Sequence, residues 1–520
     1  MYLWIIVSAT LSAYCSAVFI DAAAVFQQCG YKTNDYFVWL NKTRKRRLAK
    51  ILFSISLMAA LIVLKTAFYF DLVSYAVLCG VCLYICAYIV CGGMKLRVKP
   101  KFTFRFTRII ALSFILFGAL SLFIDCLGVK LFTAEIQYSA ILVPLYPYFI
   151  AFSSLVLTPY EKLRFKISVV KCKKRIERKN GLIKIGITGS CGKTSVKNYL
   201  AEMLAYDYKT YITPKSFNTP LGICMAVEKM PQDTEVFIAE MGARRLGDIK
   251  FLTDMVGPQI GIITAICEQH METFLSVENV KNAKYELIEG LRRGGTAIFS
   301  ADSVGSQELY DRAEIRKISA GICGENVSAE SVKITGKGTA FYLKIGGVKY
   351  FAETKLLGRH NVTDICLAAA AATELGVKPT RIISAIYRLK PPPHRLELSE
   401  TDSGVAIIDD GYNANIEGVK SAAEVIDEFD GEKFAVVSGI VEGGDQTRVL
   451  NEEVGRILKN SADSLIAVGA YSDHIARGAR GGKCKVVKFA DLSGAKDYLK
   501  GKVKRGDVVV FINDLPDRYL

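Results

Sequence analysis

The chain has 520 residues, too many for one ordinary domain, and 51% of them are apolar, with a mean hydropathy of +0.25. A charged fraction of 23% excludes a protein that lies entirely within a membrane. The formal net charge of +16 would suit a nucleic-acid-binding protein, so the distribution of that charge along the chain has to be settled first.

The positive charge lies in the first third of the chain. Residues 1–180 carry 24 Lys and Arg against 7 acidic residues, whereas residues 181–520 carry 43 against 44. Because the longer part is nearly neutral, we expect no nucleic-acid partner. The basicity has to be explained within the apolar region.

Five apolar stretches in that region have roughly the length of a membrane-spanning helix, about 20 residues. They cover residues 2–26, 51–70, 72–93, 109–128 and 137–158. The first stretch lacks a basic n-region and more apolar stretches follow it, so we interpret it as a retained span and not as a signal peptide. We predict an α-helical transmembrane region of about five spans over 1–160, followed by a basic juxtamembrane linker over 161–180.

The basic residues predict how these spans are oriented. They cluster after the first, third and fifth stretches, for example at 42–47 and 95–101. Lys and Arg near span ends stay on the cytoplasmic side, which predicts a multi-pass protein of the cell membrane with its N-terminus outside and its soluble part in the cytoplasm. A second role stays open for residues 171–178, which could bind anionic lipid headgroups or a lipid diphosphate.

Residues 182–204 have the pattern of a phosphate-binding loop between a strand and a helix. An apolar run leads into Gly189-Ser-Cys-Gly192-Lys193-Thr194, and apolar residues at helical spacing follow. Glycines allow close backbone approach, the helix N-terminus supplies N–H groups, Lys193 would meet the terminal phosphates and Thr194 would bind Mg²⁺. The spacing is shorter than in the usual motif, which would place a glycine at Ile187. We predict that ATP binds to a loop made of Gly189, Ser190, Cys191, Gly192, Lys193, Thr194 and Ser195.

Two further residues stand where strand ends would present metal ligands. Glu240 follows the apolar run 236–239, and His270 follows the run 260–266. A carboxylate suits Mg²⁺, whereas a histidine suits it only beside oxygen donors. A helix-capping role for Glu240 and a hydrogen-bonded loop position for His270 stay open.

The loop, which opens with Gly-Ile-Thr-Gly, resembles that of the Mur ligases, ATP-dependent enzymes that join an amino acid or a peptide to a carboxylate. Further matches follow in the family's order at 216–222, 239–243, 264–274, 283–286, 358–362, 393–397 and 409–415. The last three resemble in particular the branch that adds D-alanyl-D-alanine to UDP-N-acetylmuramoyl-tripeptide. The resemblance implies a P-loop α/β central domain over 181–392 and a Rossmann-like α/β C-terminal domain over 393–520.

The resemblance also implies roles for single residues. The catalytic residues would be Lys193, Lys284, His270 and Arg395. One or two Mg²⁺ ions would be held by Thr194, Glu240, His270 and Lys284, with Lys284 carbamylated by CO₂. The nucleotide would be contacted by Asn361 with His360 at the adenine, Arg395 at the γ-phosphate and Asp410 at the ribose, while Tyr412, Asn413 and Asn415 would lie near the incoming amine. A helix-start role for Asn361, a solvated position for Lys284 and a structural ion pair between Arg395 and Asp410 stay open.

The activity implied is that of a membrane-anchored ligase of cell-wall synthesis. It would convert a carboxylate into an acyl phosphate and join it to an amino acid or a dipeptide such as D-alanyl-D-alanine, with release of ADP and phosphate. The family's usual N-terminal domain, which binds the UDP-sugar, is replaced here by the apolar region, so a muropeptide and a lipid-linked acceptor are both open and membrane lipids are expected partners. The alternatives are a polyglutamate-type synthetase and a non-catalytic nucleotide-binding membrane scaffold.

Overall fold

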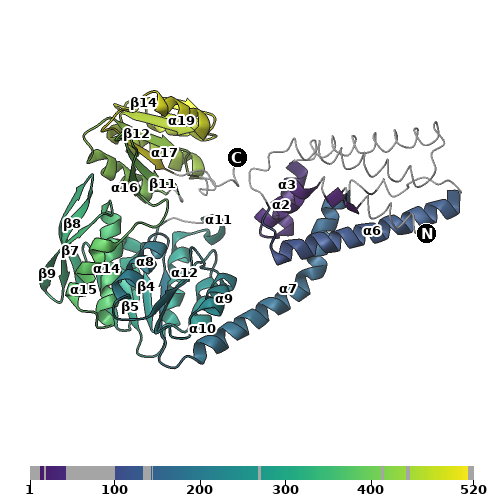
Figure 1. Ribbon diagram of the computed structural model, residues 1–520, viewed down its shortest axis with the longest axis horizontal. Helices are drawn as coiled ribbons and strands as arrows, with labels where there is room; N and C mark the ends of the chain where they lie inside the picture. Colours follow the sequence, from purple (N-terminus) through teal and green to yellow (C-terminus); the bar gives the residue numbers. More distant parts are fainter. Residues whose placement is uncertain are drawn as a thin grey trace. The chain divides into compact units, whose positions relative to one another are not determined.

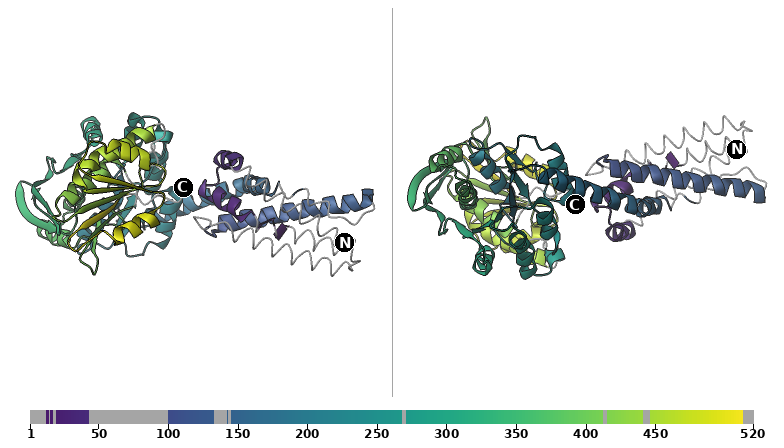
Figure 2. Two further views of the ribbon diagram at one scale, coloured as in Figure 1. Left: turned by 90° about the horizontal axis from the view of Figure 1, so that it is seen from above. Right: turned by 90° about the horizontal axis from the view of Figure 1, so that it is seen from below.

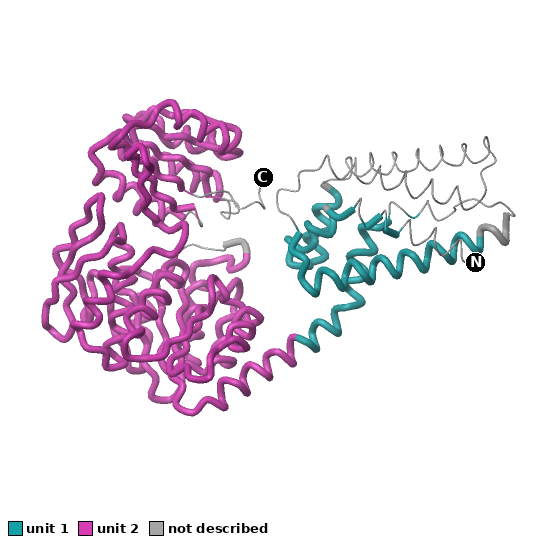
Figure 3. The backbone as a smooth tube through the Cα atoms, viewed as in Figure 1, with its two compact units in different colours: residues 1–164 teal, residues 165–520 magenta. Residues whose placement is uncertain are grey.

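The computed structural model describes residues 12–13, 15–16, 19–42, 100–132, 142, 145–267, 271–411, 415–440 and 446–512. The chain divides into two compact units, Met1–Arg164 and Phe165–Leu520 (Figure 3). The predicted spans at 51–70 and 72–93 lie outside the described residues, and those at 2–26 and 137–158 lie partly outside them.

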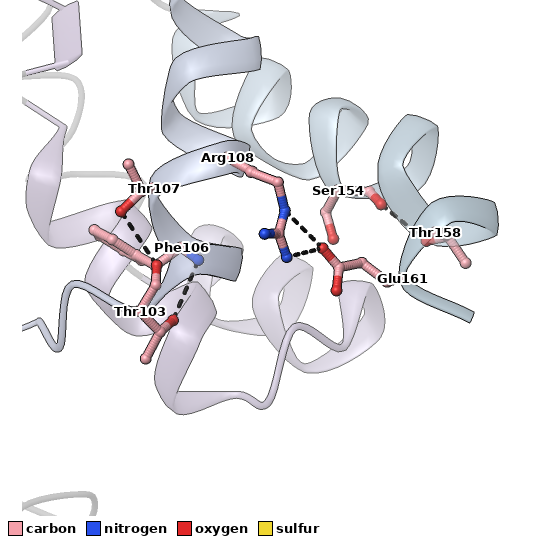
Figure 4. A network of polar contacts seen from close by, with 7 residues as sticks. All are labelled: Thr103, Phe106, Thr107, Arg108, Ser154, Thr158 and Glu161. Carbon is pink, nitrogen blue, oxygen red and sulfur yellow. Dashed lines mark hydrogen bonds and ion pairs between the residues drawn. The ribbon is translucent and has the colours of Figure 1, made fainter. Parts of the chain in front are cut away.

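The described part of the first unit is helical. Its helices are α2 (Ile20–Gln28), α3 (Thr33–Lys42), α6 (Phe104–Phe132) and the first part of α7 (Tyr146–Glu177) (Figure 1). Aromatic rings fill the space between α6 and α7, with the Phe117 ring 5.1 Å from that of Tyr146. Arg108 of α6 donates to Glu161 of α7 through Nε at 3.1 Å and Nη2 at 2.5 Å (Figure 4). Apolar packing and this ion pair together hold α6 against α7.

One helix among the described residues is long and apolar enough to cross a membrane, namely the segment Phe104–Leu127 of α6. Ile115 and Phe123 of this segment are 60% and 63% exposed, which is unusual for large apolar side chains in water. The segment coincides with the predicted span at 109–128. A single helix of this kind does not establish a region of five spans.

The basic segment 161–180, predicted as a juxtamembrane linker, is helical over most of its length. Helix α7 continues through Pro159 as far as Glu177. The reason is an apolar face at helical spacing: Val169, Cys172 and Ile176 are buried against the core of the second unit. The basic side chains occupy the remaining, largely exposed positions.

The second unit contains two α/β domains, the first built on a nine-stranded sheet. Its strand order is β2-β3-β1-β4-β5-β6-β7-β8-β9, with parallel pairing as far as β7 and antiparallel pairing beyond it. The strands are β1 (Ile183–Thr188), β2 (Thr210–Ile212), β3 (Val236–Glu240), β4 (Ile260–Ile263), β5 (Thr296–Ser300), β6 (Lys317–Gly321), β7 (Val327–Thr335), β8 (Gly338–Ile345) and β9 (Val348–Thr354).

Strand β1 is flanked by β3 and β4, and this order determines where the site forms. Ile187 pairs with Glu240 of β3, and Thr188 pairs with Ile263 of β4. The carboxyl ends of the three strands therefore meet at one edge. Ligands of open parallel sheets bind outside that edge.

Helices cover both faces of this sheet (Figure 1, Figure 2). One layer consists of α8 (Lys193–Leu204), α14 (Arg359–Glu374) and α15 (Pro379–Arg388), whose apolar side chains share one buried cluster. The other consists of α9 (Pro220–Lys229), α10 (Asp248–Val256), α12 (Val277–Glu289) and α13 (Val304–Arg312), with the short α11 (Met271–Phe274) before α12. The alanines at 368–372 of α14 are all buried, and their small side chains allow close packing.

The second α/β domain has a six-stranded sheet in the order β10-β11-β15-β12-β13-β14, in which only β10 is antiparallel. Its strands are β10 (Glu397–Glu400), β11 (Ala406–Asp410), β12 (Lys433–Val437), β13 (Ser464–Val468), β14 (Lys485–Phe489) and β15 (Val508–Ile512). Its helices are α16 (Ile416–Asp427), α17 (Thr447–Ser461), α18 (Ser472–Gly478) and α19 (Leu492–Lys500). The predictions of a P-loop α/β domain followed by a Rossmann-like α/β domain are confirmed.

Candidate active site

The phosphate-binding loop lies where the sequence predicts it, between β1 and α8. Gly192 precedes the helix with a φ of 82°, and a Cβ atom added to it would lie 2.4 Å from Asp364 Oδ1. A Cβ atom added to Gly189 would lie 1.9 Å from Thr264 Oγ1. Both glycines are therefore required by contacts with other elements, and Gly192 also by its left-handed backbone.

Lys193, the first residue of α8, folds back over this loop. Its ammonium donates to the carbonyl oxygens of Gly189 at 2.6 Å and Ser190 at 2.7 Å. Burial lowers the pKa of Lys193, and the neighbouring Glu240 carboxylate opposes that shift. The ammonium is thus held at the mouth of the loop, where the terminal phosphates of a nucleotide would bind.

Glu240, at the end of β3, is the centre of a buried polar cluster. Its Oε2 accepts from Thr194 Oγ1 at 3.0 Å and from Lys197 Nζ at 2.9 Å, and its Oε1 accepts from Asn218 Nδ2 at 3.2 Å. The side chains of Lys197 and Glu240 are 1% and 2% exposed, so this ion pair is sequestered from water. Lys197 lies one helical turn after Lys193, but no sequence motif points to it.

The cluster fits a magnesium ion bound together with a nucleotide. Thr194 and Glu240 supply a hydroxyl and a carboxylate oxygen that lie next to each other. Mg²⁺ is usually held by one or two protein oxygens, with phosphates and waters completing its shell, so two such ligands suffice. Among the described residues no group of three His, Cys, Asp or Glu forms a metal site, and the predicted ligand His270 lies outside those residues.

The loop is tied to the segment that follows β4. The backbone N–H groups of Ser190 and Cys191 both donate to the Ala265 carbonyl, at 2.8 Å and 3.3 Å. Ser190 Oγ donates to the Cys267 carbonyl at 3.0 Å, and Thr264 Oγ1 donates to the Cys191 carbonyl. The conformation of the phosphate-binding loop thus depends on segment 264–267.

Lys284 of α12 is buried, 3% exposed, and its ammonium lies 5.9 Å from the centroid of the Phe274 ring. Burial, with a contribution from the charge of Lys193, lowers the pKa of Lys284 to about 7. A large share of this amine is therefore uncharged and nucleophilic at neutral pH. The alternative of a solvated helix lysine is wrong for this side chain.

Helix α14 carries the two residues that the resemblance places at the adenine, His360 and Asn361. Asn361 is buried there; its Oδ1 accepts from Tyr199 Oη at 2.7 Å and its Nδ2 donates to the Leu357 carbonyl at 2.7 Å. Burial and the charge of Arg395 lower the pKa of His360 to about 4. His360 Nδ1 is buried without a hydrogen-bond partner among the described residues, so it is the atom of this pair that could accept a bond from a ligand.

Asp364 is an acidic group of the site that the sequence analysis missed. Burial raises the pKa of Asp364 well above its usual range, against the opposing charge of Arg395. The carboxyl lies against Gly192, next to the loop. A neutral acid can approach a phosphate-binding loop without repelling the anion that the loop would hold.

The second α/β domain brings two of its predicted residues, Arg395 and Asn415, towards this loop. The positive charge of Arg395 lowers the pKa of Cys191 and of His360, so its guanidinium lies near both. Burial raises the pKa of Asp410 to about 6, and its Oδ1 accepts from the Leu396 N–H at 3.3 Å. Asn415 caps α16 through Oδ1, and its Nδ2 donates to Cys191 Sγ at 3.2 Å. Tyr412 and Asn413 lie outside the described residues.

A loop of this kind at the edge of a parallel sheet, with a second α/β domain contributing an arginine beside it, defines a P-loop enzyme that acts on a nucleoside triphosphate. Residues 187–372 match the model of the Mur ligase middle domain, and residues 394–512 match that of the Mur ligase glutamate ligase domain. The chain belongs to the Mur ligase family, and it is an ATP-dependent amide ligase.

Two curated relatives are UDP-N-acetylmuramoyl-tripeptide–D-alanyl-D-alanine ligases. That of Bacillus subtilis (strain 168) is 30% identical over 332 residues, which cover 63% of this chain and 72% of the relative. That of Escherichia coli (strain K12) is 27% identical over 332 residues, covering 63% and 73%.

Two solved structures are similar to this chain at 25% sequence identity. MurF from Acinetobacter baumannii superposes with a TM-score of 0.63 over 67% of this chain and 77% of that structure. MurF ligase from Thermotoga maritima, solved in complex with ADP, superposes with a TM-score of 0.61 over 67% of this chain and 80% of that structure.

Proposed function

We propose that this protein joins D-alanyl-D-alanine to UDP-N-acetylmuramoyl-tripeptide in peptidoglycan synthesis. The observation that carries the proposal is the arrangement of Lys193, Thr194 and Glu240 at one sheet edge, in a chain similar to ligases that bear this name. The arrangement supports activation of a carboxylate by ATP. The similarity supports the choice of acceptor and amine.

The chemistry needs two displacements in one water-poor site. The acceptor carboxylate attacks the γ-phosphorus, the bond from phosphorus to the β–γ bridging oxygen breaks, and ADP leaves with that electron pair. The amine then attacks the acyl carbon of the acyl phosphate, phosphate leaves, and the amine loses a proton. Both steps bring anions together, so fixed positive charge is the main catalytic requirement.

The side chains of this site would meet that requirement in different ways. The Lys193 ammonium would leave the loop carbonyls for the terminal phosphates, and Arg395 would approach from the second domain. Lys197 would orient the Glu240 carboxylate, so that Glu240 and Thr194 could hold Mg²⁺, which neutralises charge on the phosphates when bound. Asp364, kept neutral by burial, would add no repulsion.

We propose in addition that Lys284 reacts with CO₂. The neutral amine attacks the carbon atom, a C–N bond forms, and loss of one proton leaves a carbamate anion. Support comes from the burial of Lys284 and from its pKa of about 7, since only the uncharged amine is a nucleophile. We expect Lys284→Ala to be inactive and short carboxylates to restore part of its activity; an alanine variant as active as the wild type would refute the carbamate.

A panel of acceptors tests the function. The wild-type protein should release ADP and phosphate only when UDP-N-acetylmuramoyl-tripeptide and D-alanyl-D-alanine are both present, and the product should have the mass of the ligated pentapeptide. Lys193→Ala is the control, because it should lose about 3 kcal/mol or more of transition-state stabilisation while the fold is kept.

Turnover with glutamate and a folate-type acceptor would favour the polyglutamate synthetase. Nucleotide binding without turnover on either panel would favour the scaffold.

We further propose that residues 1–160 form a multi-pass membrane region with the ligase unit on the cytoplasmic side, so that the acceptor is used near the membrane or on a lipid carrier. Support comes from the five apolar stretches, from the basic residues between them, and from the apolar helix Phe104–Leu127. The full chain should stay with membranes after an alkaline carbonate wash. Protease should cleave the second unit only in inside-out vesicles, where the cytoplasmic side faces the solution. Release by carbonate would refute the anchor.

A further inference from the structure

The phosphate-binding loop contains a thiol that lies against a second thiol. Cys191 lies between the two glycines of the loop, and Cys267 follows strand β4, 76 residues further along the chain. Their Sγ atoms are 3.1 Å apart, compared with about 2.05 Å in a disulfide. Both residues are partly exposed. A movement of roughly 1 Å would bring the sulfur atoms to bonding distance.

The surroundings of Cys191 favour its thiolate. The hydrogen bond between the two sulfur atoms, followed by the positive charges of Lys193 and Arg395, lowers the pKa of Cys191. Asn415 Nδ2 donates to the same sulfur at 3.2 Å. The pKa of Cys267 is raised by that same hydrogen bond and by burial. Cys191 therefore has the character of an attacking thiolate, and Cys267 that of the thiol that completes a disulfide.

We propose that Cys191 and Cys267 form a reversible disulfide when the protein meets a peroxide, and that this bond shuts the nucleotide site. The Cys191 thiolate attacks one oxygen of hydrogen peroxide, the O–O bond breaks, and a sulfenic acid and hydroxide result. The Cys267 sulfur then attacks the Cys191 sulfur, the S–O bond breaks, and water leaves once the thiol proton is transferred. Overall, two thiols are oxidised and one peroxide is reduced to two waters. A dithiol such as dithiothreitol reverses the reaction by exchange.

The bond would act on the loop through contacts that are already present. The N–H groups of Ser190 and Cys191 donate to the Ala265 carbonyl, and they must turn from it if they are to bind phosphate. A covalent link to Cys267, two residues beyond Ala265, would hold them in place. The loss of one or two charge-assisted hydrogen bonds to phosphate corresponds to roughly 10- to 100-fold weaker nucleotide binding.

Other cysteines of the described chain provide the contrast. Cys172 and Cys224 are hydrogen-bonded neighbours in the core, but they are only 4% and 7% exposed, so a peroxide would reach them poorly. Cys323 is exposed in the turn between β6 and β7, far in sequence from the loop. Only the pair at the loop combines exposure, proximity and a stabilised thiolate among the cysteines that the structure describes.

The test uses the full chain in detergent and reads the bond and ADP binding separately. The wild type is treated with hydrogen peroxide, free thiols are blocked with N-ethylmaleimide, and the digest is searched for a peptide joining Cys191 to Cys267. We expect that peptide, a loss of ADP affinity of about tenfold or more, and recovery of both with dithiothreitol. Because neither readout uses an acceptor, failure of the proposed ligation would not be confused with failure of this proposal.

Two cysteine variants test whether the loss of ADP affinity comes from this disulfide. Cys267→Ser should bind ADP like the wild type under reducing conditions and should show no dithiothreitol-reversible loss after peroxide, whereas Cys323→Ser should respond like the wild type. If Cys267→Ser does not fold, Cys267→Ala replaces it, and the peptide search on the wild type is unaffected. Absence of the joined peptide in the wild type, or its formation with unchanged ADP affinity, overturns the proposal.

Discussion

The buried pair of Lys197 and Glu240 allows a quantitative test of the site. Its charged atoms are 2.9 Å apart and both side chains are almost fully removed from water. Removal of one partner from such a pair leaves an uncompensated buried charge and costs about 3–5 kcal/mol. We therefore expect Lys197→Met and Glu240→Gln each to lower the free energy of unfolding of the second unit by about 3 kcal/mol or more.

The double variant should lose much less stability than the sum of the losses in the two single variants. With both charges removed, Lys197→Met/Glu240→Gln should recover most of the lost stability and come within about 1–2 kcal/mol of the wild type. It should still be inactive, because the carboxylate proposed to hold Mg²⁺ is gone. Stability and activity would thus separate in one protein.

The measurement has to report on the second unit. The only two tryptophans of the chain, Trp4 and Trp39, both belong to the first unit, so pulse proteolysis in urea is preferred to intrinsic fluorescence. Lys209→Met is the matched control. Lys209 pairs with Asp233 at 3.0 Å, but the two side chains are 66% and 63% exposed, so the change should leave the free energy of unfolding close to that of the wild type. Additive losses in the double variant would show that the two buried charges do not stabilise each other.

Three further predictions concern the walls of the site. Gly192→Ala should abolish ADP binding in calorimetry, because its Cβ would lie 2.4 Å from a carboxylate oxygen of Asp364 in α14. Gly247→Ala is the control, since Gly247 also has a positive φ of 86° but has open space around its Cβ position. It should lower the free energy of unfolding by only about 1 kcal/mol and keep ADP binding. Activity that depends on the Lys284 carbamate should fall between pH 8 and pH 6, as the amine gains a proton around its pKa of about 7; a flat pH profile would contradict this reasoning. Tyr199→Phe should destabilise the protein by about 1–3 kcal/mol, because Asn361 Oδ1 would lose its hydrogen-bond donor. Asn361→Ala should bind ADP more weakly than the wild type, and equal affinities would exclude a direct contact with the adenine.

The local features of the site could be predicted from the sequence. Strand β1, the loop and helix α8 follow one another within about 20 residues. An apolar run predicts the strand, the glycines predict the loop, and apolar residues at helical spacing predict the helix. Glu240 could be placed at a strand end for the same reason. These predictions needed no knowledge of which strands lie side by side.

The long-range partners could not be predicted in this way. Lys197 of α8 meets Glu240 only because β3 lies beside β1. Thr264 and Asp364 lie against the loop only because β4 is the other neighbour of β1 and because α14 packs against α8. A parallel sheet with helical crossovers does not reveal its strand order through periodicity. Asn361 illustrates the same point: its sequence position suggested a helix start, and the contact with Tyr199 arises from the packing of α14 on α8.

The electrostatics of the site show why it should attract a triphosphate although residues 181–520 as a whole are nearly neutral. Burial lowers the pKa values of Lys193 and Lys197, and the Glu240 carboxylate between them already accepts a hydrogen bond from Lys197. Among the residues that the structure describes, Lys193 donates to two loop carbonyls, which carry no net negative charge. Phosphate oxygens at the loop would supply the missing negative charge, so nucleotide binding should raise the pKa of Lys193 and stabilise the second unit. A local excess of buried positive charge, and not the net charge of the chain, is therefore what selects the ligand.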